Sequence, residues 1–169
     1  MKILVVGDSC LDTFIYGDID RIAPEAPVPV IKPKYKKENP GMAANVVANL
    51  KSLGAEVDLI TNSTLIKKIR FVDERYNQMV LRVDENDFCN RIDFNNIIFE
   101  GESKSIKKSN LNLEYINKNY NAIVISDYCK GFLEDEDIEK FTKLDIPSFI
   151  DTKKKLGDWC LNVDFIKIN

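Results

Sequence analysis

MKILVVGDSCLD, residues 1–12, begins with a continuous apolar run and ends with two aspartates. The run from Ile3 to Val6 is typical of a buried strand in a parallel sheet, because both faces of such a sheet are covered. Gly7 and Asp8 end the run, and Asp12 follows four residues later. In open α/β sheets, ligands bind at the carboxyl ends of the strands. The stretch therefore predicts an α/β fold, and its two carboxylates leave three interpretations open: a sugar site, a metal site or a polar turn.

Strand-like and helix-like segments alternate along the chain, which predicts a parallel sheet with helical cover, of the α/β class. Apolar residues repeat at helical spacing after residue 42, and Gly54 stands where a C-terminal cap belongs. The segment 134–144 begins with acidic residues, which favour a helix N-terminus. Further strands are predicted at residues 57–61, 97–99, 122–126, 147–151 and 163–168, and helices at residues 43–53, 111–118 and 134–144.

Two segments do not fit this alternation. Residues 20–41 contain five prolines, which exclude a helix and suit an edge strand or an extended arm. Residues 68–84 alternate between apolar and polar side chains around a polar turn, as in a half-solvated hairpin. We interpret the chain as a single domain, 1–169, with a small β lid formed by residues 13–38 and 68–84. Most of the polar stretch 85–110 is expected to be a loop.

Composition excludes several classes of function. The net charge of −3 argues against a nucleic-acid binder driven by global charge, and no apolar run approaches the length of a membrane span. Four cysteines without a CxxC pair indicate reduced thiols and a cytoplasmic protein. The absence of histidine removes His-based triads, His-ligated zinc and His general bases. Chemistry at a site must therefore use carboxylates, lysine, backbone amides or a bound cation.

Several longer motifs resemble one protein family. They are GDSCLDTFIYGDIDRIAPEAPVPVIK (7–32), NPGMAANVVANLKSLGA (39–55), KKIRFVDERYNQMVLRVD (67–84), VISDYCKGFL (124–133) and IDTKK (150–154). Together they resemble the ribokinase-like (PfkB) carbohydrate kinases, and within these the heptose-7-phosphate kinase domain of the bifunctional ADP-heptose synthesis proteins. The terminal KIN is similar to the K-P-N of this family. The proline-rich and PGMAAN blocks are its most specific signatures.

The resemblance implies roles for individual residues. Asp12 would bond sugar hydroxyls, since a carboxylate accepts two hydroxyl donors in a fixed orientation. The backbone at Gly41 would approach the sugar closely. The full implied substrate-binding set is Asp12, Gly41, Met42, Asn45, Asp127 and Arg82, and residues on the substrate or nucleotide side are Asp8, Lys130, Asp151, Lys153 and Asn169. No catalytic residue and no metal ligand are assigned in this chain.

Plainer structural interpretations stay open beside these roles. Asn45 would cap the N-terminus of its helix, either in place of a contact with the sugar or together with it. Asp127 and Asp151 would simply end strands. The cations of the hairpin, Lys68, Arg70 and Arg82, either meet the substrate's phosphate or form a solvated face with cross-strand pairing to Asp73 or Asp84.

Departures from the family limit the predicted activity. The family's domain is nearly twice as long, and its second half carries a G-A-G-D motif that supplies the general base and an anion hole, together with the nucleotide pocket. This sequence has no such motif, and it lacks the family's extra α/β unit after residue 61. The expectation is a truncated ribokinase-like fold that binds a sugar phosphate but is not self-sufficient for phosphoryl transfer. The alternative is a non-catalytic binding or interaction module derived from such a kinase.

Cofactor and partners follow from the same resemblance. Mg-ATP is the family's cofactor, and this chain alone is not expected to bind it. The expected partners are a small-molecule sugar phosphate, and either a second copy bound through the β lid or a companion chain that supplies the missing half. Nucleic acid and membrane are not expected as partners. The identity of the sugar is left open.

Overall fold

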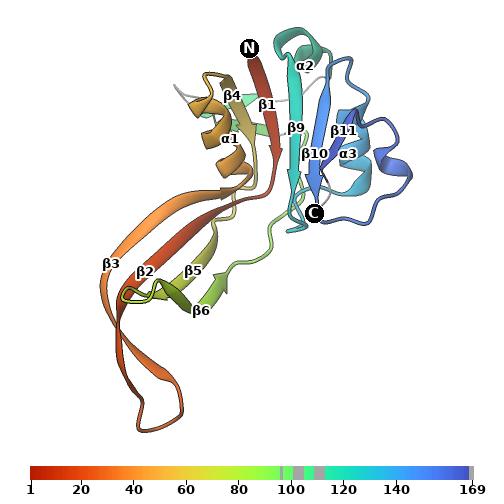
Figure 1. Cartoon of the computed structure of the whole chain (residues 1–169). Coiled ribbons are helices and arrows are strands. Elements are labelled where there is room, and N and C mark those ends of the chain that lie inside the picture. Colours follow the sequence, from red (N-terminus) through yellow and green to blue (C-terminus); the bar gives the residue numbers. More distant parts are fainter. Residues whose placement is uncertain (96, 101–104, 109–112, 168–169) are drawn as a thin grey trace.

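The computed structural model describes residues 1–95, 97–100, 105–108 and 113–167. Figure 1 shows a body, built on one sheet with helices on both faces, and a long arm of strands that extends away from it. The sheet of the body has the order β11-β10-β9-β1-β4-β7-β8. Its strands are β1 (Lys2–Gly7), β4 (Glu56–Ile60), β7 (Ile97–Glu100), β8 (Ser105–Lys108), β9 (Ala122–Asp127), β10 (Ser148–Thr152) and β11 (Phe165–Lys167).

The five strands from β11 to β4 are parallel, as the alternating sequence pattern predicts. β1 lies at their centre: Ile3 pairs with Val57 of β4 on one side and with Ala122 of β9 on the other. β7 and β8 form an antiparallel edge next to β4. The prediction of one short strand in residues 85–110 was therefore incomplete, because a hairpin is present there.

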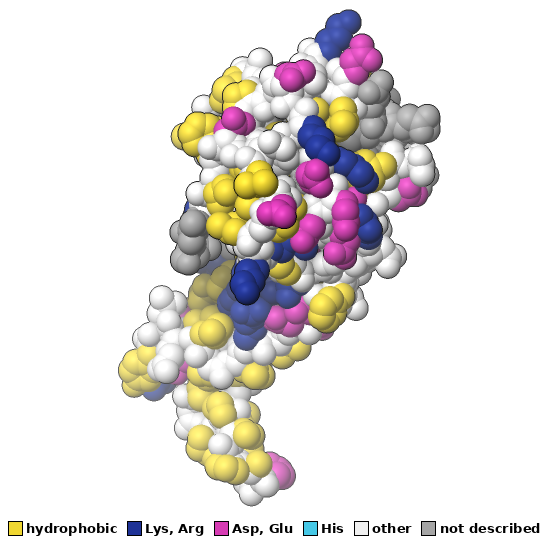
Figure 2. All heavy atoms as spheres, turned by 90° about the vertical axis from the view of Figure 1, so that its right-hand side faces the viewer, with side chains coloured by type: hydrophobic (Ala, Val, Ile, Leu, Met, Phe, Trp, Pro, Cys, Tyr) yellow, Lys and Arg dark blue, Asp and Glu magenta, His cyan; other side chains and the backbone are white. Residues whose placement is uncertain are grey.

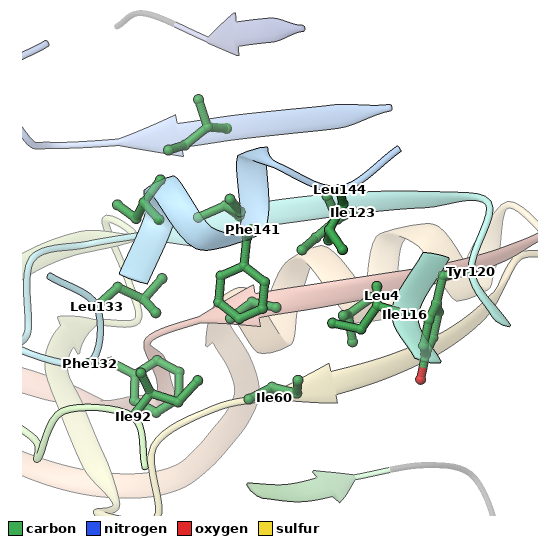
Figure 3. Packing of buried hydrophobic residues seen from close by; sticks show 14 of the residues in the cluster. Leu4, Ile60, Ile92, Ile116, Tyr120, Ile123, Phe132, Leu133, Phe141 and Leu144 are labelled. Carbon is green, nitrogen blue, oxygen red and sulfur yellow. The ribbon is translucent and has the colours of Figure 1, made fainter. Parts of the chain in front are cut away.

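Alternate residues of β1 are buried against opposite helical layers. On one face Ile3 and Val5 pack with Ala43 of α1 (Ala43–Ser52). On the other face Leu4 belongs to a larger core that includes residues of α2 (Leu113–Asn119) and α3 (Asp135–Thr142), as Figure 3 shows. This core continues to the short 3₁₀ helix η1 (Asp158–Cys160). Burial on both faces explains why β1 is a continuous apolar run.

The arm is a separate four-stranded sheet of order β3-β2-β5-β6. Its strands are β2 (Ser9–Ile22), β3 (Pro29–Met42), β5 (Ile66–Asp73) and β6 (Gln78–Glu85). β3 is an edge strand, which explains how a strand with three prolines is tolerated. The predicted hairpin at residues 68–84 is confirmed, and β2 and β3 extend beyond the predicted range 13–38 in both directions.

Short links join the arm to the body. Asp8 alone separates β1 from β2, and β3 runs directly into α1. Residues 61–65 connect β4 to β5, and Asn62 fastens this link to the base of the arm. Its Oδ1 accepts from the Ser9 N–H at 2.7 Å, and its amide donates to the Thr64 carbonyl at 2.6 Å. The base of the arm is therefore held by hydrogen bonds as well as by the covalent links.

Within the described residues, no helix is long and apolar enough to cross a membrane.

Candidate functional site

Asp12 and Gly41 lie together where the arm meets the body. β2 and β3 pair antiparallel, with Cys10 opposite Gly41 and Asp12 opposite Asn39. A Cβ atom at residue 41 would overlap with the Asp12 carboxylate and the Cys10 thiol, so any other residue there would require these two side chains to move. Asp12 and Gly41 are thus neighbours, and the missing side chain at Gly41 makes room for the carboxylate.

Met42 connects this pair to α1 through an unusual backbone conformation. Its φ of 57° and ψ of −130° lie in a region that side chains disfavour, and its own side chain is buried. Met42 is the N-cap residue of α1, and the Ala43 N–H donates to the Asp8 carbonyl at 2.9 Å. The interpretation of Asn45 as the helix cap is therefore wrong. Asn45 lies inside the first turn and is exposed, and its contact with a sugar stays a prediction.

Charged side chains of β2, β5 and β6 meet on the face of the arm that carries Asp12. Arg70 donates to the Asp12 carboxylate, and these two side chains are about one-fifth exposed. Arg82 holds Asp84 with two hydrogen bonds, of 2.6 Å from Nε and 2.5 Å from Nη2. The predicted cross-strand pairing with Asp84 is present for Lys68, whereas Arg82 pairs with Asp84 of its own strand and Arg70 pairs with Asp12.

The loop after β9 joins the same group of charges. Lys130 donates to Asp87 at 2.6 Å, and the buried Lys68 lies 3.5 Å from Asp87 and 3.6 Å from Asp84. The seven residues Asp12, Lys68, Arg70, Arg82, Asp84, Asp87 and Lys130 are called the ion-pair cluster below. Figure 2 shows basic and acidic side chains gathered where the arm joins the body.

Hydrogen bonds within the cluster shift the pKa values of its carboxyls. The bond from Arg82 lowers the pKa of Asp84 to about 2. The bond from Lys130 lowers the pKa of Asp87. Both carboxylates are therefore charged at neutral pH. Asp87 was not singled out from the sequence, although the acidic residues that follow the hairpin were a signal for it.

Asp8 is fully buried and ties β1 to the loop after β9. Its carboxylate accepts from the backbone N–H of Tyr128 at 2.7 Å and from that of Phe132 at 3.4 Å. Burial raises the pKa of Asp8, and these backbone donors oppose the rise. Since its oxygens face protein donors, the structure places Asp8 as a support of this loop.

Asp127 is buried in a similar way at the end of β9. Its two oxygens accept from the Cys129 N–H at 3.0 Å and from the Thr152 hydroxyl at 2.8 Å. Asp127 therefore joins the end of β9 to the end of β10, and its predicted contact with a ligand stays a prediction.

The remaining predicted site residues lie toward β11. Asp151 pairs with Lys167 at 2.7 Å. The Lys153 ammonium lies 5.1 Å from the centre of the Tyr128 ring, a cation–π contact. Asn169 lies outside the described residues. Among the described residues, the contacts of Asp151 and Lys153 thus lie outside the ion-pair cluster.

A surface groove of about 430 Å³ lies beside the base of the arm. It is lined by residues 9–11, 38–40, 44 and 61–65, and Asp12 is not among them. One lining residue, Ser9, has a buried hydroxyl without a hydrogen-bond partner among the described residues. The groove therefore adjoins the predicted sugar side without including the ion-pair cluster.

The described residues do not present a site for Mg-ATP. Among the described residues, no group of three or more Cys, Asp or Glu side chains is arranged to hold a metal ion. Two of the carboxylates at strand ends, those of Asp8 and Asp127, are already occupied by protein donors. The sequence also contains no glycine-rich phosphate loop.

Sequence comparison with known proteins finds several relatives that share one description. No protein-family model matches the chain. The chain is 34% identical over 177 aligned positions to the bifunctional protein HldE of Campylobacter jejuni, and 31% identical over 170 positions to that of Vibrio vulnificus. HldE of Haemophilus influenzae is 34% identical over 182 positions. These alignments cover 89–90% of this chain and 35–36% of the relatives, so the chain spans about a third of the length of the curated relatives it matches.

Solved structures with a similar fold are carbohydrate kinases. A carbohydrate kinase from Agrobacterium tumefaciens matches with a TM-score of 0.56 at 14% identity, over 98% of this chain and 59% of that one. A ribokinase from Arabidopsis thaliana, complexed with ribose and ATP, matches with a TM-score of 0.52 at 12% identity, over 97% and 58%. A ribokinase from Thermotoga maritima matches with a TM-score of 0.51. At these identities the likeness concerns the fold alone.

Proposed function

Since this chain is homologous to the bifunctional HldE proteins and has the fold of ribokinase-like carbohydrate kinases, we propose that it binds a sugar phosphate as a heptose 7-phosphate kinase does. One observation carries the proposal. The Asp12 carboxylate, placed against Gly41, shares one face of the arm with the guanidinium groups of Arg70 and Arg82. An acceptor for sugar hydroxyls thus stands beside donors suited to a phosphate.

The chemistry of each group suits its proposed part of the ligand, the carboxylate the hydroxyl groups and the arginines the phosphate. A carboxylate accepts hydrogen bonds from two hydroxyl groups and so fixes the orientation of a polyol. The guanidinium group of arginine presents a rigid fork of donors that matches a phosphate. Gly41 contributes by leaving its backbone unobstructed, and Asn45 extends the hydroxyl-binding side from the first turn of α1.

Other predicted residues take supporting roles in this proposal. Asp8 and Asp127 hold the loop between β9 and α3, which carries Lys130 to the ion-pair cluster. Met42 sets the start of α1 next to Gly41. Asp151 and Lys153 lie farther along the sheet edge, on the side where a nucleotide would approach.

Phosphoryl transfer requires more than a sugar site. It needs positioned phosphates, a cation and a group that orients the attacking oxygen. We propose that polypeptide beyond these 169 residues supplies the nucleotide side, in keeping with the third of the relatives' length that the chain spans. A companion chain would complete such an assembly, whereas a second copy bound through the arm would not supply the nucleotide side. The chain then contributes the substrate half of a kinase.

Thermal unfolding tests the proposal directly. The midpoint is measured with heptose 7-phosphate, with Mg-ATP and with both, because a ligand that binds only the folded state raises the midpoint by mass action. We expect a rise with the sugar phosphate, and none with Mg-ATP. The absence of any response to heptose 7-phosphate would refute sugar-phosphate binding. A rise with Mg-ATP would refute the placement of the nucleotide side outside the chain.

Asp12→Asn provides the variant for this test. An amide keeps the shape but loses one acceptor and the charge, so the rise caused by heptose 7-phosphate should fall strongly. Asp20→Asn on the same strand is the matched control, since Asp20 pairs with the exposed Lys32 far out on the arm. The control should respond to the ligand as the unaltered chain does.

A further inference from the structure

The arm places two arginines directly opposite each other. Arg70 of β5 pairs in register with Arg82 of β6, so both side chains stand on the same face of the arm. Like charges at opposed positions of an antiparallel pair destabilise a sheet. Here each guanidinium is held by its own carboxylate, Arg70 by Asp12 and Arg82 by Asp84. Asp12 and Asp84 therefore accept hydrogen bonds from the two opposed arginines.

The surrounding charges leave this region cationic. The ion-pair cluster contains four cations and three carboxylates, a net charge of +1. One cation, Lys68, is only 8% exposed, so it is partly removed from water. Fixed cations in a partly desolvated place favour an additional anion. A phosphate monoester brings nearly two negative charges and three acceptor oxygens.

The hydrogen bond from Arg70 to Asp12 competes with the binding of sugar hydroxyls to Asp12. Arg70 donates to Asp12, so the same carboxylate cannot offer all its acceptor positions to hydroxyl groups. The ring of Phe14 lies 5.0 Å from the Arg70 guanidinium carbon and covers part of that group. Since both charged side chains are mostly buried, water is a poor replacement partner for either.

We propose that Arg70 couples the two parts of the ligand: its phosphate withdraws Arg70 from Asp12, and this exchange frees Asp12 for the sugar hydroxyls. The proposal rests on the proposed function and adds the basis of its specificity. A phosphorylated sugar supplies its own replacement for the broken ion pair, whereas an unphosphorylated sugar must break that pair without compensation. Arg70 is thus a specificity-determining residue, and Arg82 binds phosphate without controlling Asp12.

Calorimetry on the unaltered chain gives the first test. Three probes are titrated at constant ionic strength: heptose 7-phosphate, unphosphorylated heptose and inorganic phosphate. Because coupling between two sites is reciprocal, inorganic phosphate should strengthen the binding of unphosphorylated heptose, and heptose should strengthen the binding of phosphate. Independent binding of the two probes would overturn the proposal. This measurement needs no variant and so does not depend on the folding of one.

Variants separate the two arginines. Arg70→Gln should weaken heptose 7-phosphate by about 10- to 100-fold, the loss of a charged hydrogen bond. The same change should strengthen the binding of unphosphorylated heptose by roughly fivefold or more, because this sugar no longer has to break the ion pair between Arg70 and Asp12. Arg82→Gln should weaken the phosphorylated ligand alone. Arg70→Lys should restore part of the discrimination, since it keeps the charge but loses the fork.

Lys67→Gln is the matched control, because Lys67 belongs to the same strand but pairs with Glu85 outside the ion-pair cluster. It should leave all three affinities unchanged. Equal weakening of both sugars in Arg70→Gln would assign Arg70 a merely structural role and overturn the coupling. If the unaltered chain binds neither sugar, the proposed function itself fails. Binding of heptose 7-phosphate without opposite responses in Arg70→Gln refutes the coupling alone.

Discussion

Replacement of Met42 by glycine and by alanine should reverse the usual stability order of these two residues. Met42 has a φ of 57° and a ψ of −130°, which glycine adopts without strain and alanine does not. Its side chain is 7% exposed and packs with Cys10 and Ile66. Both replacements remove this side chain, so the lost burial is common to them. Their difference isolates the backbone.

The magnitudes can be compared term by term. Loss of the buried methionine costs about 2–5 kcal/mol in either variant. A side chain in a sparsely populated backbone region costs about 1–3 kcal/mol, and only glycine relieves it. Glycine offsets about 0.5–1 kcal/mol of this gain, because it makes the unfolded chain more flexible and so lowers the free energy of unfolding. Met42→Gly should therefore be the more stable variant by about 1 kcal/mol, although both are less stable than the unaltered chain.

Urea unfolding measures this difference. Circular dichroism follows the whole chain, and fluorescence follows the single tryptophan, Trp159, which is buried in the body. Ala48→Gly on the exposed side of α1 is the control, and it should lose about 0.5–1 kcal/mol in the ordinary direction. If Met42→Ala is as stable as Met42→Gly, the argument from backbone strain is wrong.

Three further predictions concern titratable side chains. Asp8→Ala should lower the free energy of unfolding by about 2 kcal/mol or more, because two buried backbone donors lose their acceptor; in urea unfolding Asp8→Asn should lose less, and equal losses would contradict this. The hydrogen bond from Arg82 holds the pKa of Asp84 at about 2. The ion pair therefore contributes fully to the free energy of unfolding above pH 3.8, the ordinary pKa, and this contribution is lost as the pH falls through about 2. NMR titration should show this pKa rising toward 3.8 in Arg82→Gln, and an unchanged value would refute the assigned cause. Burial raises the pKa of Cys10 to about 11, so iodoacetamide at pH 8 should modify the exposed Cys129 first, as mass spectrometry would show, and faster modification of Cys10 would contradict the structure.

The body could be predicted well from sequence because its signals are local. The apolar run at Ile3 to Val6 predicts β1, and Gly54, with its φ of 84°, ends α1 as a C-terminal glycine does. The prolines of residues 20–41 correctly indicated an edge strand. The hairpin of β7 and β8 was only half predicted, because residues 85–110 carry little periodic pattern and their pairing depends on β4.

The candidate site was less predictable because it depends on register between distant strands. Motifs identified Asp12 and Gly41, and the antiparallel pairing of β2 with β3 does bring them together. The bond from Arg70 to Asp12 follows from the parallel pairing of β2 with β5, which no local pattern specifies. The alternative role of Asn45 as a helix cap was wrong, because Met42 precedes the first helical residue and is the N-cap.

The central position of β1 has a consequence for synthesis of the chain. β1 leaves the ribosome before both of its partners; β4 ends at Ile60, whereas β9 begins only at Ala122. At about 5–20 residues per second, roughly 3–12 seconds pass between these two strands. During this interval one edge of the most apolar strand has no partner to pair with. The need for chaperones during translation should therefore be concentrated between the appearance of β4 and that of β9.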